Sequence, residues 1–103
     1  MISYIKGILV SVSPSTVVID VNGIGYAVFI SCRVLSELSP VGEKVQLHTS
    51  FVVREASQAL YGFLSPHERD LFELLMNVSG VGPKLSLSLI GHLTISELQM
   101  AVA

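Results

Sequence analysis

Residues 77–84 read Asn77-Val78-Ser79-Gly80-Val81-Gly82-Pro83-Lys84, and this stretch decides the fold of the second half of the chain. An apolar-periodic segment leads into it and a second one follows, which is the pattern of two helices. Glycine after one helix and proline in the first turn of the next are typical of helices joined by a very tight turn. The sequence therefore predicts a helical hairpin at Gly80-Val81-Gly82.

The predicted turn has the chemistry of a phosphate site. Gly80 can adopt positive φ, and Gly82 lets another chain's backbone come close because it has no Cβ. The first-turn N–H groups of the second helix have no partner inside that helix, and Lys84 lies beside them. The candidate binding residues are Ser79, Gly80, Val81, Gly82 and Lys84, with Val81 expected to point inward. An ordinary turn with a solvated Lys84 stays open as the alternative, because short glycine motifs are common by chance.

Composition limits the size of the fold and the kind of DNA contact. The chain has 103 residues, half of them hydrophobic and 14% charged, so we expect one modest globular domain or two small ones. The net charge is −2, with only six Lys and Arg, which counts against a general nucleic-acid binder that coats phosphate backbones. Any DNA contact must be local, and the high apolar fraction suggests surface buried against another subunit.

The sequence predicts no metal, cofactor or membrane segment. Cys32 is the single cysteine, so an internal disulfide is excluded, and we expect a small buried side chain. His48, His67 and His92 lie far apart and are expected to be surface or satisfied residues rather than ligands. No apolar run approaches the ~20 residues that span a bilayer, and no secretory leader is visible, so a cytoplasmic protein is the simplest expectation.

The first part of the chain has the pattern of a small barrel. Five short strands are predicted at residues 2–10, 16–21, 26–30, 45–53 and 58–63, with a short helix at 33–38. Gly7 is a plausible bend or bulge, and Asn22-Gly23 is a strong hairpin signal. We therefore expect a five-stranded OB-type barrel over residues 1–64, with a polar tip at residues 54–57. Tyr61 and Phe63 are expected to be core or seam residues rather than base-stacking platforms.

From Ser65 the apolar period becomes helical. Ser65 and Glu68 have the spacing of a capping box, with proline between them at the first helical position. The first helix is predicted to run to about residue 77, the second over residues 83–90, and a third from Thr94 toward the end of the chain. Residues 65–103 would then form a helix-hairpin-helix domain that is incomplete at its carboxyl end, as in a truncated sequence.

The acids of the first predicted helix have a simple interpretation. Glu68, Asp70 and Glu73 are expected to form a solvated face. Arg69 could reach a phosphate, but pairing with Glu73 at i, i+4 is the preferred interpretation.

The order of these elements resembles the RuvA family of Holliday junction-binding proteins. The matching segments are Lys6-Gly7-Ile8, Gly23-Ile24-Gly25-Tyr26, Phe51-Val52-Val53-Arg54-Glu55, Leu60-Tyr61-Gly62-Phe63, Glu68 through Leu71-Phe72, and Gly80-Val81-Gly82-Pro83-Lys84. The resemblance covers the whole chain. It implies structure-specific binding of four-way DNA junctions in recombination, repair and the SOS response, by a homotetramer that could form an octamer around one junction.

The resemblance also implies an acidic pin at the tip between the last two strands. Glu55, with Arg54 adjacent, matches that pin, and a carboxylate there would repel phosphates and keep the junction arms apart. The family commonly has two acids in succession, whereas this chain has Ala56 after Glu55, so we expect a weaker pin. A solvated loop acid is the alternative for Glu55.

The family's partners are the RuvB branch-migration motor and the RuvC resolvase. Its second helix-hairpin-helix and its third domain, which contacts RuvB, have no counterpart in this sequence, so RuvB contact is expected to be lost. No phosphate loop or catalytic triad spacing is present, so a non-catalytic subunit is expected. The alternative from another class is an oligomerising OB-fold scaffold that assembles a protein complex without binding DNA.

Overall fold

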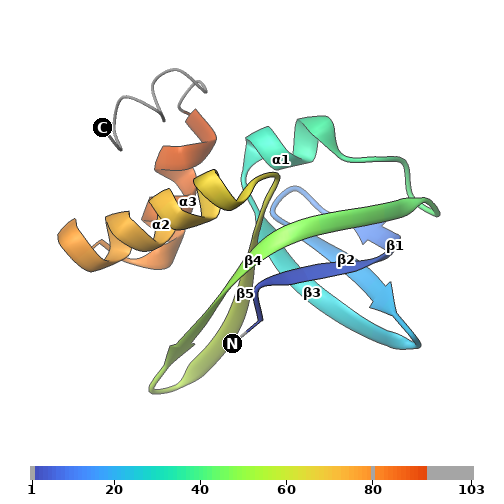
Figure 1. Ribbon diagram of the computed structural model, residues 1–103, viewed down its shortest axis with the longest axis horizontal. Helices are drawn as coiled ribbons and strands as arrows, with labels where there is room; N and C mark the ends of the chain where they lie inside the picture. The colour runs from blue at the N-terminus through green and yellow to red at the C-terminus, as the bar shows by residue number, and fades with distance from the viewer. Residues whose placement is uncertain (1, 80, 93–103) are drawn as a thin grey trace.

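The computed structural model describes residues 2–79 and 81–92 (Figure 1). The elements in chain order are β1 (Tyr4–Val12), β2 (Thr16–Val21), β3 (Ile24–Ile30), α1 (Cys32–Glu37), β4 (Lys44–Arg54), β5 (Ser57–Phe63), α2 (Pro66–Ser79) and α3 (Pro83–His92). The predictions for Gly80 and for a third helix from Thr94 lie outside the described residues. Within residues 2–79 and 81–92, no helix is long and apolar enough to cross a membrane.

The five strands form a closed barrel in the order β1-β2-β3-β5-β4, with β4 pairing back onto β1. Every neighbouring pair is antiparallel except β3 and β5, which run parallel. Helix α1 connects β3 to β4, as predicted, so the OB-type barrel is confirmed. The predicted irregularity at Gly7 is wrong, because the register shifts between Leu9 and Ser11 instead. Gly7 pairs regularly and lies against the Asp20 carbonyl, where a Cβ would clash.

The β2–β3 hairpin confirms the Asn22-Gly23 signal. Asn22 has φ +53° and Gly23 φ +89°, both in the left-handed region that a two-residue hairpin loop of this type needs. The Gly23 N–H donates to Asp20 Oδ1 at 2.8 Å, which fixes the turn from the strand before it.

Two hydrophobic cores lie on opposite sides of β5. The barrel core consists of Ile5, Leu9, Val17, Ile19, Val28, Ile30, Val34, Leu47 and Leu60. The second core joins β4 and β5 to the two long helices and consists of Val52, Tyr61, Phe63, Leu71, Phe72, Leu87 and Ile90. Successive strand residues point to opposite faces, so Leu60 enters the barrel while Tyr61 and Phe63 face the helices. The prediction that Tyr61 and Phe63 are core residues is confirmed.

Aromatic rings form the centre of the second core. The Tyr61 ring stacks on Phe29 with centroids 5.4 Å apart and meets Phe72 at 5.1 Å. Phe63 meets Phe72 at 5.0 Å. Because such rings bury large apolar areas, this core holds α2 and α3 firmly against the barrel wall.

Helix α2 begins as predicted, but two of its acids are not solvated. The Glu68 N–H donates to Ser65 Oγ at 3.2 Å, which confirms the N-cap. The Glu68 side chain is buried and faces Arg33 of α1 instead of solvent. Glu73 accepts a hydrogen bond from Ser50 Oγ at 2.8 Å. The solvated-face prediction therefore holds only for Asp70, which is exposed.

Two further side-chain predictions are wrong. Arg69 does not pair with Glu73: its Nε lies 3.3 Å from Asp70 Oδ1, and its Nη1 donates to the Ser3 carbonyl at 3.1 Å. Cys32 is exposed rather than buried, because it begins α1 at the surface, where its thiol donates to the Gly91 carbonyl at 3.4 Å.

Candidate nucleic-acid interface

The turn between α2 and α3 presents an open backbone at Gly82. The Gly82 carbonyl accepts from the Ser86 N–H at 3.1 Å and from Ser86 Oγ at 3.0 Å, so Gly82 caps α3. Gly82 is exposed, and no heavy atom lies within 4 Å of the position that a Cβ would take. The outer side of this residue is therefore free for another molecule to approach.

The first turn of α3 supplies hydrogen-bond donors beside that opening. Pro83 has no N–H, and the Ser86 N–H is already bonded, which leaves the amides of Lys84 and Leu85 without a helical acceptor. Both residues are exposed. Two outward amides, the positive end of the helix dipole and the Lys84 ammonium group together suit an anion. Val81 is half-buried, while Gly80, the other glycine of the motif, lies outside the described residues.

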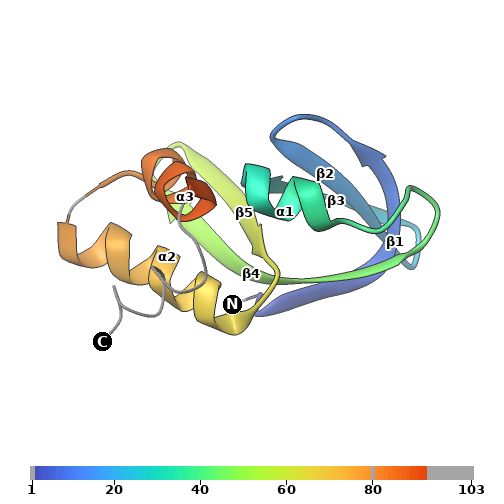
Figure 2. The same ribbon diagram turned by 90° about the horizontal axis from the view of Figure 1, so that it is seen from above.

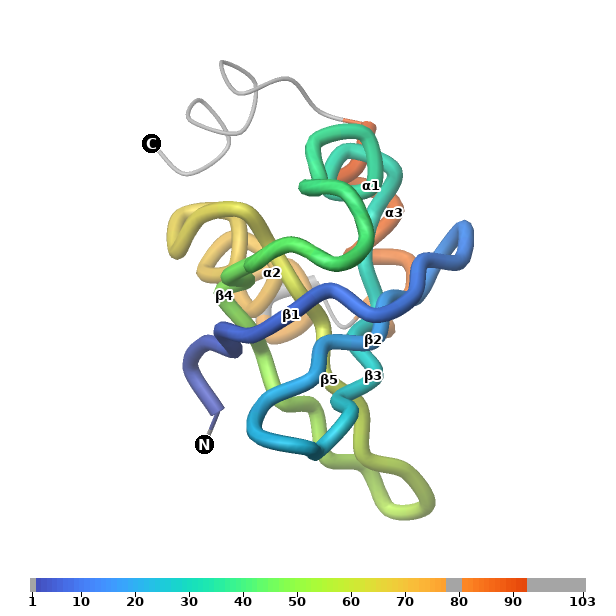
Figure 3. Tube along the Cα trace, turned by 90° about the vertical axis from the view of Figure 1, so that its right-hand side faces the viewer, coloured from blue at the N-terminus to red at the C-terminus, as the bar shows by residue number. Residues whose placement is uncertain are grey.

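The tip between β4 and β5 is shorter than predicted. Arg54 and Ser57 form the last pair of the ladder, so the turn itself contains only Glu55 and Ala56. Both turn residues are exposed, and Figure 3 shows this hairpin extending beyond the rest of the barrel. The Glu55 carboxylate thus stands at the end of a projecting two-stranded arm. Arg54 leans toward the last turns of α2, with its Nη2 3.9 Å from Met76 Sδ.

The two turns lie on the same side of the molecule. Figure 1 shows β4 and α2 both running toward the left of the view, and Figure 2 shows the α2–α3 turn at the end away from the barrel. Each turn carries one exposed cation, Arg54 at the tip and Lys84 in α3. Arg33 and Arg69 are held by contacts inside the fold, so they do not add to this surface.

A cavity of about 400 Å³ lies between α3 and the barrel, and sequence reasoning gave no sign of it. Its lining includes Lys84 and His92 of α3, Cys32 of α1, and the barrel residues Phe29 and Tyr61. Among residues 2–79 and 81–92, no group of three or more His, Cys, Asp and Glu side chains is placed so that it could hold a metal ion.

A family model described as the RuvA N terminal domain matches residues 1–62. The chain belongs to the RuvA family. Curated relatives extend the similarity into α2 and α3: one from Protochlamydia amoebophila is 60% identical over 102 residues, and one from Idiomarina loihiensis is 49% identical over 102 residues. Both are named Holliday junction branch migration complex subunit RuvA, and both alignments cover 99% of this chain.

The similarity to RuvA covers only part of each relative. The alignments span 51% and 50% of the two relatives, so this chain spans about half the length of the curated relatives that it matches. The residues matched by the family model include β1 to β4 and most of β5, which is the barrel that carries the tip. The family predicted from the sequence motifs is thereby confirmed.

Proposed function

We propose that this chain is the junction-binding portion of a RuvA subunit, a non-catalytic protein that holds four-way DNA junctions open for branch migration. The observation that carries the proposal is the close relationship to proteins named as subunits of that complex, over almost the whole chain. The exposed helical turn and the projecting acidic tip support it, because each has chemistry suited to a different part of a junction.

The turn between α2 and α3 would grip one phosphate of a duplex arm. Its donors are backbone amides and Lys84, and neither kind of group distinguishes one base from another. Close approach at Gly82 lets the amides reach the phosphate oxygens directly. Binding would then be independent of base sequence and weakened by salt, because each phosphate contact releases counterions.

The tip would act by repulsion. Glu55 places a negative charge at the end of the β4–β5 arm, and a carboxylate near phosphates opposes the collapse of duplex arms into the junction centre. A homotetramer would gather one such acid per subunit, because Glu55 is followed by Ala56 and not by a second acid. The pin of this chain would therefore be a weak one.

The partners follow from the same proposal. A RuvB-type motor would supply ATP hydrolysis, and a RuvC-type resolvase would act on the open junction, so the chain itself would hydrolyse nothing. The subunit would work in the cytoplasm on chromosomal DNA. The portion described here contributes junction recognition, and the motor contact is expected elsewhere in a full-length relative.

Gly82→Val is the test of the hairpin. The open space around Gly82 allows the variant to fold, so a loss of four-way junction affinity would report blocked backbone approach. Gly82→Ala is the matched control and should lose less affinity, because its side chain is smaller. Circular dichroism checks the fold of both variants. Junction binding by Gly82→Val that equals wild type would overturn the hairpin assignment.

A second candidate is an oligomerising scaffold without DNA binding. It is favoured by three exposed apolar side chains of β1, at Ile8, Val10 and Val12. Exposed apolar side chains close together on a small protein are typical of a surface that another subunit covers. Self-association without any binding to a four-way junction would support this candidate.

A further inference from the structure

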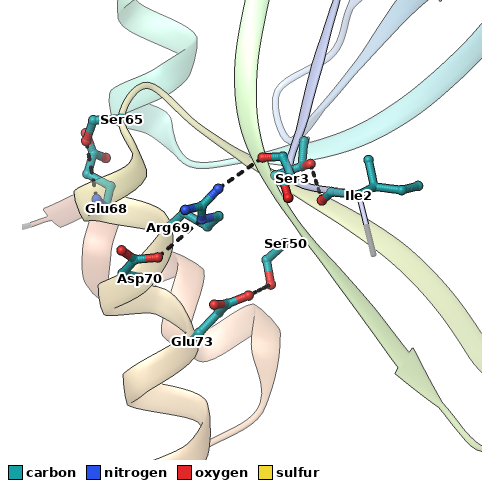
Figure 4. Close-up of polar contacts among 9 residues, drawn as sticks. Ile2, Ser3, Ser50, Ser65, Glu68, Arg69, Asp70 and Glu73 are labelled. Carbon is teal, nitrogen blue, oxygen red and sulfur yellow. Dashed lines mark hydrogen bonds and ion pairs between the residues drawn. The ribbon is translucent and has the colours of Figure 1, made fainter.

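Helix α2 is joined to the pin-bearing side of the barrel by a line of polar contacts (Figure 4). Arg69 Nη1 donates to the Ser3 carbonyl at 3.1 Å, and Ser50 Oγ donates to Glu73 Oε2 at 2.8 Å. We call these two contacts the polar seam. The Ser3 carbonyl also accepts from the Thr49 N–H at 2.9 Å. This hydrogen bond holds the segment before β1 against β4.

The seam follows one face of the helix and one face of the strand. Arg69 and Glu73 are four residues apart, so they share a face of α2. Ser50 and Arg54 are an even number of residues apart, so they share the outer face of β4 with Val52, which belongs to the core against the helices. Because Ser50 meets α2 before Arg54 meets Met76, the strand and the helix run alongside each other in the same direction.

This shared direction links the two candidate DNA-contacting turns. Strand β4 ends at the tip that holds Glu55, and α2 ends at the turn before Gly82. A slide or rotation of α2 on β4 would therefore change the separation of the two turns. The close packing of the apolar core beneath resists such a shift, and directional polar contacts at its edge add a further constraint on the register of α2 against β4.

We propose that Glu73 and Arg69 are positioning residues, which fix the helical hairpin relative to the acidic tip through Ser50 and the Ser3 carbonyl. This inference rests on the proposed junction binding. Hydrogen bonds suit the task because they weaken steeply when distance or angle changes. The Ser50–Glu73 hydrogen bond is strengthened by the charge of the carboxylate. Because Ser50 is only 3% exposed, water would not readily replace Glu73 as its partner if Glu73 were substituted.

Binding measurements test the seam with a matched pair of variants. Glu73→Leu removes the acceptor for Ser50, whereas Glu73→Gln keeps an oxygen at the same position. We expect Glu73→Leu to weaken junction binding about fivefold, the effect of losing one hydrogen bond, and Glu73→Gln to recover most of it. Affinity for a linear duplex should stay the same in both variants, because a duplex arm held by one hairpin does not require alignment with the tip.

A distance measurement tests the same inference without DNA. Spin labels are attached at Ala56→Cys in the tip and at Asn77→Cys near the end of α2, in a Cys32→Ser background. Pulsed electron paramagnetic resonance then measures the distribution of distances between the two labels. The expected result is a narrow distribution that broadens or shifts with Glu73→Leu and is restored with Glu73→Gln. An unchanged distribution in Glu73→Leu would overturn the positioning role. Absence of junction binding by wild type would contradict the proposed function alone, because the distances would still report the seam.

Discussion

Glu68 Oε2 lies 4.0 Å from Arg33 Nε, in a buried contact between α2 and α1. The distance is beyond hydrogen-bond range, so the pair interacts by charge alone. Burial raises the pKa of the Glu68 carboxyl above its usual value, and Arg33 only partly opposes that effect. Glu37 raises the pKa further, whereas His67 lowers it. The first turn of α2 therefore holds a carboxylate that the fold disfavours in its charged form.

The stability of the fold should respond to this group as pH changes. Because the pKa of Glu68 is higher in the folded chain, the folded state binds this proton more strongly than the unfolded state does. The Glu68 contribution to stability is thus most favourable at acid pH and is lost as pH rises through the folded pKa. Glu68→Gln has no such proton, so its unfolding free energy relative to wild type should increase from acid to neutral pH in urea titrations. A difference that stays constant or falls would contradict this prediction.

Arg33→Met provides the complementary control for the same pair. It leaves the buried Glu68 carboxylate without its nearest positive charge, which should cost about 3 kcal/mol of unfolding free energy at neutral pH, the lower end of the range for a broken buried pair. The cost should shrink at acid pH, where Glu68 is protonated. A cost that does not depend on pH would mean that the charge of Glu68 is not what Arg33 compensates.

Gly62 should tolerate no side chain. A Cβ at this position would stand 2.7 Å from Val28 Cγ1 and 2.9 Å from Leu47 Cδ1, and both of those residues are fully buried in the barrel core. Gly62→Ala should therefore lower the free energy of unfolding by about 1–3 kcal/mol through overpacking. Gly82→Ala, which meets no atom within 4 Å, is the control on the same urea denaturation assay. Equal stability of the two variants would contradict the packing account.

Lys84→Gln should reduce the salt dependence of junction binding. The ammonium group is exposed in the first turn of α3, where it would neutralise one phosphate per subunit. Removing it should lower the slope of log affinity against log salt by about one for each hairpin engaged. The titration is repeated at several salt concentrations, with Lys44→Gln on the barrel as the control. An unchanged slope in Lys84→Gln would place Lys84 outside the interface.

Glu55→Gln should weaken the preference for junctions rather than binding in general. Loss of the tip charge removes repulsion toward phosphates. The affinity for linear duplex should therefore increase, and the affinity for the junction should increase by a smaller factor. The ratio of the two affinities, measured by anisotropy, is the relevant quantity. Ala56→Asp adds a second acid at the tip and should move the ratio in the opposite direction. Ratios that do not change in either variant would leave Glu55 as a solvated turn residue.

Local signals in the sequence were sufficient for the strands and turns of the barrel and for the start of α2, but not for the bulge, which lies between Leu9 and Ser11 and not at Gly7. The Asn22-Gly23 turn and the Ser65 cap depend on residues within a few positions of each other, and both occur as predicted. The alternation of Leu60 and Tyr61 on β5 likewise follows from strand geometry.

Contacts between distant segments could not be predicted in this way. Glu68 has the spacing of a capping acid, yet it is buried because α1, far earlier in the chain, brings Arg33 against α2. Ser50 and Glu73 meet only because β4 and α2 pack together. The predicted local pair of Arg69 and Glu73 therefore does not form. Helical periodicity identifies a face of α2 but does not say what covers that face.

The most direct test of the central claim is an anisotropy titration of this chain against a labelled four-way junction and a linear duplex of the same arm sequence, at low salt. The account predicts tighter binding to the junction by at least about tenfold, equivalent to about 1.4 kcal/mol. Equal affinity for both DNAs, or no binding to either, would contradict it.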